Sequence, residues 1–150
     1  TGPLYVQALG FDGNQGTYRL NASILGDTNR DGLLNAADID ATYEASQQTS
    51  SDPVFDLSED GMVSSEDLEI LIQDIFATVR GDIDLNGTVD FTDFLIFSAA
   101  FGKNGGWSAG DFGGDGNVEF ADFLILSANF GTDLRHAGTR EIDNSRDHIR

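Results

Sequence analysis

An acidic twelve-residue loop occurs four times in this chain of 150 residues, at 27–38, 56–67, 82–93 and 111–122. Each copy has aspartate first, glycine sixth, an aliphatic residue eighth and aspartate twelfth. A calcium ion requires this order from a folded-back backbone: alternating oxygen side chains point inward, the carbonyl of position seven joins them, and a terminal carboxylate closes the shell. A single match also fits an Asx-rich surface turn. Four matches, each followed by an apolar helical pattern, predict metal-binding loops.

The charge of the chain is concentrated in these loops. They hold 16 of its 26 acidic residues, and with 8 Lys and Arg the net charge is −18. Carboxylates packed close together repel one another unless a cation lies among them, so we expect the metal-free protein to be loose and to become ordered on binding calcium. The charge leaves no basic face for nucleic acid. No segment reaches the roughly 18 unbroken apolar residues of a membrane span.

The predicted ligands lie at loop positions 1, 3, 5, 7, 9 and 12, where position seven contributes its backbone carbonyl. In chain order they are Asp27, Asn29, Asp31, Leu33, Asn35 and Asp38; Asp56, Ser58, Asp60, Met62, Ser64 and Asp67; Asp82, Asp84, Asn86, Thr88, Asp90 and Asp93; and Asp111, Asp115, Asn117, Glu119 and Asp122. Loop four has Gly113 at position three and lacks one side-chain ligand, and loop two relies on two serines. We therefore expect up to four calcium ions, bound tightest by loops one and three.

Positions six and eight are expected to shape each loop. The glycines of position six permit a sharp turn in a backbone conformation that costs other residues a steric penalty; they are Gly32, Gly61, Gly87 and Gly116. The aliphatic residues of position eight are predicted to form a short antiparallel bridge between paired loops and to pack beneath the ions; they are Leu34, Val63, Val89 and Val118.

Each loop is expected to lead into a helix. Apolar or mostly apolar residues recur at loop positions 13, 16 and 20, and steps of three and four place them on one helical face. They are Ile39, Thr42 and Ser46; Leu68, Leu71 and Ile75; Phe94, Phe97 and Phe101; and Phe123, Leu126 and Phe130. Tyr43 is expected to supply the anchor that Thr42 does not. Position nine is the expected N-cap, and Gly102 and Gly131 the expected helix ends.

Loop starts at 27, 56, 82 and 111 give spacings of 29, 26 and 29 residues, which suggests a duplicated two-loop unit. The near copies VDFTDFLIFSAAFG and VEFADFLILSANFG agree with this. We expect one pair of loops in 26–80 and a second in 81–131, with pairing of loops two and three as the open alternative. Residues 1–25 are predicted to form a β-hairpin left from a preceding β-domain. Residues 132–150 are predicted to be a flexible tail.

All four loops end in Asp rather than Glu, and the segments that enter them are mostly not helical. With these features, GDTNRDGLLNAADID, GDIDLNGTVDFTDF and GWSAGDFGGDGNVEFADF make residues 26–131 resemble the dockerin type I family of tandem F-hand (EF-hand-like) calcium repeats. The likeness is closest to the four-loop dockerin-like C-terminal regions of large exported bacterial proteins. LYVQALGFDGNQGTYRLNAS resembles the end of a pre-peptidase C-terminal β-sandwich domain. The resemblance implies a mainly α, non-catalytic module that docks or anchors a larger secreted protein.

Dockerins bind a cohesin domain through loop positions 10 and 11 and a basic or polar pair further along the helix. The corresponding residues include Phe91, Thr92, Ser98, Phe120, Ala121 and Ser127. Because the helix pair is not basic here, the partner is left as a cohesin-like domain or another surface protein. The alternative is a calcium-stiffened cap or spacer of a cell-surface protein without a dedicated partner. Burial of Phe91, Phe120 and Trp107 would favour the spacer, and an exposed patch would favour a partner.

Other function classes have weaker support in the sequence. His136 and His148 lie in the tail, there is no Cys, and the acids already serve the loops, so no catalytic site is predicted. A calcium sensor requires Met-rich helices, and Met62 is the single methionine. Trp107 is expected to anchor a loop, with sugar stacking as the alternative. Calcium loops of modest affinity stay filled outside the cell, so we expect an extracellular or cell-surface location and a longer exported parent protein.

Overall fold

The structure is a computed structural model that describes residues 24–48 and 50–135, and in these residues it is helical with no strand. Its α-helices are α1 (Ala36–Gln47), α2 (Ser65–Glu69), α3 (Phe91–Ala100) and α4 (Phe120–Asn129). Helix α2 continues into the π-helix η1 (Ile70–Ile75), and the 3₁₀ helix η2 (Trp107–Ala109) precedes loop four. The predicted mainly α fold is confirmed, whereas the hairpin predicted at 1–25 lies almost wholly outside the described residues. None of these helices has the length and apolar character that crossing a bilayer demands.

Each α-helix begins at position ten of its loop, because the loop itself caps it. The side chains of Asn35, Ser64 and Asp90, in extended backbone, accept hydrogen bonds from the N–H groups two residues further on. In return, the aspartate of position twelve accepts from the position-nine N–H at 2.7–2.9 Å in all four loops. This reciprocal capping box satisfies N–H groups that a helix start leaves without partners. The predicted N-caps at Asn35, Ser64 and Asp90 are confirmed.

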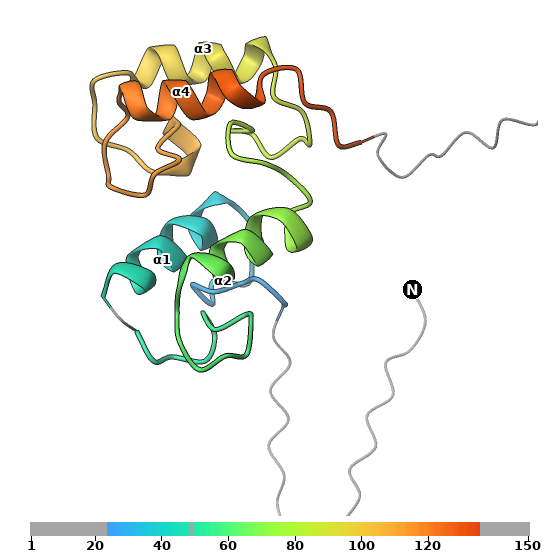
Figure 1. Cartoon of the computed structure of the whole chain (residues 1–150), viewed down its shortest axis with the longest axis vertical. Coiled ribbons are helices and arrows are strands. Elements are labelled where there is room, and N and C mark those ends of the chain that lie inside the picture. The colour runs from blue at the N-terminus through green and yellow to red at the C-terminus, as the bar shows by residue number, and fades with distance from the viewer. Residues whose placement is uncertain (1–23, 49, 136–150) are drawn as a thin grey trace, which may run out of the picture.

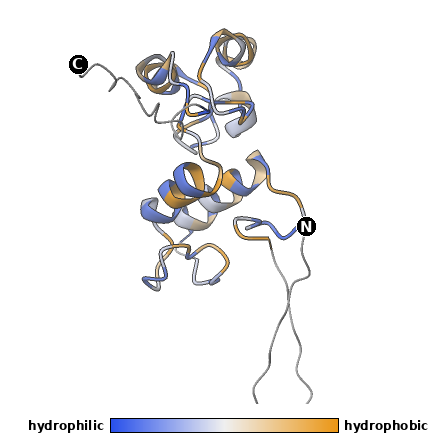
Figure 2. Ribbon diagram, turned by 90° about the vertical axis from the view of Figure 1, so that its right-hand side faces the viewer, coloured by the Kyte–Doolittle hydropathy of each residue, from blue (hydrophilic) through white to orange (hydrophobic). Residues whose placement is uncertain are grey.

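The described chain forms two halves (Figure 1). Helices α1 and α2, the latter with η1, lie side by side in the first half, residues 24–48 and 50–80. Helices α3 and α4 lie side by side in the second half, residues 81–135, and Figure 2 views them nearly end on. Position sixteen of every repeat is almost fully buried, as predicted, at Thr42, Leu71, Phe97 and Leu126.

The predicted apolar stripe ends early in the second half. Phe101 and Phe130, at position twenty, are 50% and 52% exposed. Helices α3 and α4 stop at Ala100 and Asn129, and Gly102 and Gly131 then reverse the chain at φ of 78° and 87°. These two phenylalanines therefore leave the helical face that buries Phe97.

Loops three and four each pair with the segment that follows the helix of the other repeat. Val89 donates its N–H to the Thr132 carbonyl (2.9 Å) and accepts from the Gly131 N–H (2.8 Å). The equivalent bonds of loop four join Val118 to Lys103 (2.9 Å) and Gly102 (2.8 Å). Antiparallel bridges Thr88–Asp133 and Asn104–Asn117 extend both contacts.

The structure corrects three predictions. The expected bridge between the position-eight residues is wrong for loops three and four, because the chain that reverses at Gly102 and Gly131 occupies their backbone groups. In loop one, Leu34 is 40% exposed and does not pack as predicted. The tail also starts later than predicted, because Thr132 and Leu134 are hydrogen-bonded to loop three. Residues 136–150 lie outside the described part.

Trp107 joins the two halves. Its indole is fully buried, meets Phe112 edge-on at a centroid distance of 5.4 Å, and donates to the Asp82 carbonyl at 2.9 Å. Its backbone N–H donates to the Asp40 carboxylate of α1 at 2.7 Å. Nearby, the Tyr43 hydroxyl of α1 donates to the Phe112 carbonyl at 2.5 Å. The predicted anchoring roles of Trp107 and Tyr43 are confirmed, and sugar stacking on Trp107 is wrong because its ring is buried.

Candidate metal centres in the four loops

The carboxylates at the two ends of each loop turn inward and are held there by backbone N–H groups. In loop three Asp82 accepts from Asn86 (3.0 Å) and Gly87 (2.7 Å), and Asp93 accepts from Ile83 (2.8 Å). The first aspartate of every other loop likewise accepts from positions five and six, as Asp27, Asp56 and Asp111 do. The last aspartate accepts from the start of its loop, as Asp38, Asp67 and Asp122 do. All four loops thus close in the same way.

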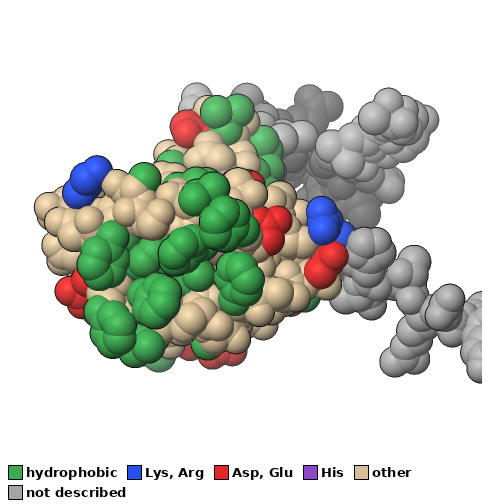
Figure 3. Space-filling model, turned by 90° about the horizontal axis from the view of Figure 1, so that it is seen from above, with side chains coloured by type: hydrophobic (Ala, Val, Ile, Leu, Met, Phe, Trp, Pro, Cys, Tyr) green, Lys and Arg blue, Asp and Glu red, His purple; other side chains and the backbone are tan. Residues whose placement is uncertain are grey.

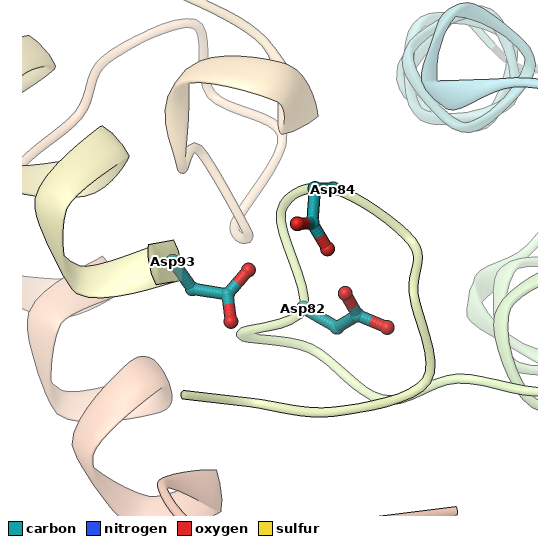
Figure 4. Close-up of side chains that lie close together, drawn as sticks. All are labelled: Asp82, Asp84 and Asp93. Carbon is teal, nitrogen blue, oxygen red and sulfur yellow. The ribbon is translucent and has the colours of Figure 1, made fainter. Parts of the chain in front are cut away.

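Loop three brings three carboxylates together. Asp82 and Asp84 extend from the loop and Asp93 from the start of α3, and their side chains face a common space (Figure 4). One oxygen from each lies within 4.8 Å of the others. Oxygens that bind one calcium ion at roughly 2.4 Å lie at most about 4.8 Å apart. No other set of three acidic, His or Cys ligands in residues 24–48 and 50–135 meets this spacing.

The predicted ligands differ in depth. Positions one and twelve lie at the bottom of each loop. Asp82 and Asp93 are fully buried, and the aspartates at these positions in the other loops are buried too, except Asp56, which is half-buried. Asp84 and Asn86, at positions three and five, are exposed, as are Asn29, Asp31, Asp60 and Asp115 in the other loops. Each loop is therefore anchored below and open to solvent above, so an ion could reach the carboxylates directly from solvent.

Position five of each loop bends the backbone that carries position seven. Its side-chain oxygen accepts from the N–H of position seven at 2.8–2.9 Å, and the residues concerned are Asp31, Asp60, Asn86 and Asp115. At position seven, the side chains of Leu33 and Met62 are more than 60% exposed, whereas those of Thr88 and Asn117 also donate to the side-chain oxygen of position five. At position nine, Asn35, Ser64 and Asp90 use one oxygen to cap their helix. Gly113 offers no side-chain ligand, as predicted.

Loop carboxylates are shifted in both directions: hydrogen bonds from Thr92 lower the pKa of Asp90, and against burial those from Ser58 and Ser64 lower the pKa of Asp67. The pKa values of the first aspartates of loops three and four are shifted upward. Burial raises the pKa of the Asp82 carboxyl above its ordinary 3.8, and the neighbouring Asp93 raises it further, against hydrogen bonds from Thr78 and Gly87. Burial likewise raises the pKa of Asp111, and Asp122 adds to the effect. A raised carboxyl pKa means that the local environment disfavours the negative charge. A cation held between these groups would remove that penalty.

One feature of the loops was not predicted from the sequence. Position four has a positive φ in all four loops: Arg30 and Glu59 at 61°, Leu85 at 57° and Gly114 at 69°. A residue other than glycine pays roughly 1–2 kcal/mol for this conformation. The glycine of loop four was the one available signal, because the other three residues have no preference for it. The glycines of position six have φ of 84–88°, as predicted.

The donor set fits a hard divalent cation. Every side-chain ligand is a carboxylate, an amide or a hydroxyl, and the described residues contain neither Cys nor His. Calcium and magnesium bind such oxygen ligands, whereas zinc and copper favour sulfur and imidazole nitrogen. The buried aspartates keep their N–H partners, and no buried side-chain N or O atom in the described part lacks a hydrogen bond.

The predicted partner residues lie on the outside of α3 and α4. Phe91 and Phe120, at the two helix starts, are 61% and 62% exposed. Thr92, Ser98, Ala121 and Ser127 are exposed as well. All six residues are therefore accessible on the surface.

Comparison of the chain with protein-family models, with curated proteins and with solved structures finds no match. Function is therefore inferred from the loops and from the exposed surface of the molecule.

Proposed function

We propose that this chain is a calcium-binding, non-catalytic, dockerin-like module that docks or anchors a larger secreted protein through a protein–protein contact. The observation that carries the proposal is the common closure of the four loops. In each, the first and last aspartates point inward on backbone N–H donors, and an α-helix starts at position ten. A chance turn rich in Asp does not repeat this arrangement four times.

Calcium would be held in each loop by the carboxylates of positions one and twelve from below and by the side chains of positions three and five from above, except that loop four, with Gly113 at position three, offers position five alone. The ion supplies positive charge that offsets repulsion between carboxylates such as Asp82, Asp84 and Asp93. Since each closed loop also caps a helix, binding would stabilise the helices that carry Phe97 and Leu126 into the core. Ion binding and folding would then be coupled.

The organisation in two pairs of repeats, 26–80 and 81–131, is part of the proposal. It is supported by the reciprocal hydrogen bonds of Val89 and Val118, in which each repeat binds the chain that leaves the other. It is also supported by the side-by-side packing of α1 and α2. Pairing of loops two and three lacks comparable contacts among the described residues, although Trp107 and Tyr43 hold the two halves together.

Docking is favoured over the spacer function by the exposed aromatic residues. Phe91 and Phe120 are more than 60% exposed on neighbouring helices, whereas the buried Trp107 serves the interior. A spacer has no use for such a patch, which costs free energy in water. The partner would be a cohesin-like domain or another surface protein, outside the cell, where calcium fills open sites of modest affinity.

A calcium titration followed by circular dichroism and calorimetry tests the calcium function. We expect little helical signal in EDTA, a large gain on adding calcium, and binding of up to four ions; magnesium is the control cation. Asp82→Ala should reduce the gain, and Asp74→Asn, which removes an exposed charge outside the loops, should not. Equal helix content in EDTA and in calcium would contradict the proposal.

A pull-down with cohesin-like domains and other surface proteins, with calcium and with chelator, tests the docking function. Capture that requires calcium and is lost on Phe91→Ser with Phe120→Ser is the expected result. If calcium orders the protein but no partner binds, the calcium-stiffened cap or spacer is the better description. The contacts of Trp107 and Tyr43 favour that second function, because they make the two halves one stiff unit.

A further inference from the structure

Helices α3 and α4 present an uncharged apolar surface to solvent, here called the α3–α4 face. Its large side chains are each 50–62% exposed: Phe91, Leu95, Phe101, Phe120, Leu124 and Phe130. Spacings of three and four residues put Phe91, Leu95 and Ser98 on one side of α3, and the same holds in α4. Figure 3 shows hydrophobic side chains gathered on this side of the molecule. Contiguous patches of this kind mark interaction surfaces in soluble proteins.

The α3–α4 face repeats itself about a two-fold axis. Phe91 and Phe120 occupy the same loop position, as do Leu95 and Leu124 and also Phe101 and Phe130. The two helices run in opposite directions side by side (Figure 1). Each first phenylalanine stacks on the ring three residues later, at 5.8 Å in α3 and 5.9 Å in α4. The face therefore offers the same groups twice, in opposite orientations.

The α3–α4 face also differs from the rest of the molecule in its charge. The acids within the two helices, Asp93 and Asp122, are buried in their metal loops, so the exposed residues of both helices carry no charge. The whole chain, in contrast, has a net charge of −18. The exposed acids Asp90 and Glu119 adjoin Phe91 and Phe120 at the helix starts, whereas the middle of the face, at Leu95 and Leu124, has no exposed charged residue within its helix.

We propose that the α3–α4 face is a homodimer interface, on which a second copy of this chain docks about a two-fold axis. The proposal rests on the proposed function, because it names the docking partner of that module and needs the fold that calcium assembles. A two-fold dimer brings the same patch of both chains together. Because the exposed residues of α3 and α4 carry no charge, these helices offer little to a basic partner, whereas a second copy presents apolar side chains at the same positions.

The size of the face agrees with such a dimer. A large apolar side chain has roughly 200 Å² of surface, so six such side chains that are half exposed present on the order of 600 Å² of apolar surface. Stable specific interfaces bury about 800 Å² on each partner. The exposed Ser98, Ala99, Ser127 and Ala128 lie on the same two helices and would add to the contact. Small side chains there let the backbones of two copies approach closely.

Sedimentation velocity on the full chain in calcium, from micromolar to submillimolar protein, tests the proposal. We expect a monomer–dimer equilibrium that strengthens as salt rises, because salt screens the repulsion between acidic chains while the apolar contact persists. Leu95→Lys with Leu124→Lys buries two charges in the interface and should raise the dimer dissociation constant at least about tenfold. Ile24→Lys with Leu25→Lys adds the same charge at exposed positions outside the face and should change it less than about twofold.

Three results would overturn the dimer. The first is a protein that binds calcium by calorimetry yet stays monomeric throughout; this leaves the calcium function standing. The second is a lysine variant that dimerises as tightly as the wild type while its circular dichroism spectrum shows that it is folded. If the lysine substitutions unfold the chain, the variant Leu95→Ser with Leu124→Ser is measured instead. The third is capture of a foreign protein by a strictly monomeric chain, which assigns the face to that partner. Absence of any calcium effect on folding would instead refute the proposed function.

Discussion

The substitution Asp84→Asn should change stability in opposite directions with and without calcium. Asp84 is exposed at position three of loop three, and one of its oxygens lies within 4.8 Å of oxygens of Asp82 and Asp93. Its Oδ1 accepts from the Asn86 N–H at 3.2 Å, a bond that an asparagine oxygen can keep. Loop one already has an asparagine, Asn29, at this position. The substitution therefore removes one charge and little else.

The size of the effect follows from Coulomb's law. Two charges 4.8 Å apart in a water-like dielectric repel by about 0.9 kcal/mol, and this separation is shorter than the Debye length of about 8 Å at physiological salt. With two neighbours, removal of the Asp84 charge should stabilise the metal-free fold by about 1–2 kcal/mol. In calcium the same change removes a charged ligand. If calcium affinity falls tenfold, the free energy by which saturating calcium stabilises the fold decreases by about 1.4 kcal/mol.

Helix content in EDTA and urea midpoints in saturating calcium would measure the two effects. Asp84→Asn should gain ellipticity in EDTA and lose resistance to urea in calcium. Asp74→Asn, on an exposed stretch of η1, should show no such reversal. If Asp84→Asn destabilises the protein equally under both conditions, repulsion among the three carboxylates does not limit folding, and the electrostatic reasoning for loop three fails.

Three further outcomes are expected. First, the metal-free protein should gain helix content as pH falls from neutral towards 3.8, because burial raises the pKa of Asp82 and Asp111 and the folded state then binds protons more tightly than the unfolded state. Ellipticity in EDTA that weakens over this range would contradict this. Second, Gly116→Ala should destabilise the calcium-bound protein by about 1–2 kcal/mol through backbone strain at its φ of 85° alone, since nothing lies within 4 Å of the added methyl group. Gly113→Ala, whose added methyl group makes ordinary contacts, should be tolerated, and equal urea midpoints for the two variants would refute the strain. Third, Tyr43→Phe should lose the hydrogen bond to the Phe112 carbonyl and cost about 1 kcal/mol, measured by thermal unfolding and contradicted by an unchanged transition.

The residues of the candidate sites could be predicted from the sequence, because a metal loop is a local object. The alternation of oxygen side chains, the glycine at position six and the capping aspartate all act within twelve residues. The helix starts at position ten, the buried position sixteen and the inward-facing Asp82 and Asp93 follow from that local order. Even so, the positive φ at Arg30, Glu59 and Leu85 was missed, since nothing in those residue types favours it.

Contacts between distant segments depended on the folded chain. Phe91, Phe97 and Phe101 lie on one helix or at its end, yet only Phe97 is buried, because burial depends on where α4 packs and where Gly102 reverses the chain. In the same way, Val89 pairs with Thr132 rather than with the equivalent valine of loop four. A hydrophobic side chain is equally stabilised by any apolar neighbour, so local periodicity can identify a buried face but does not determine which segment will cover it.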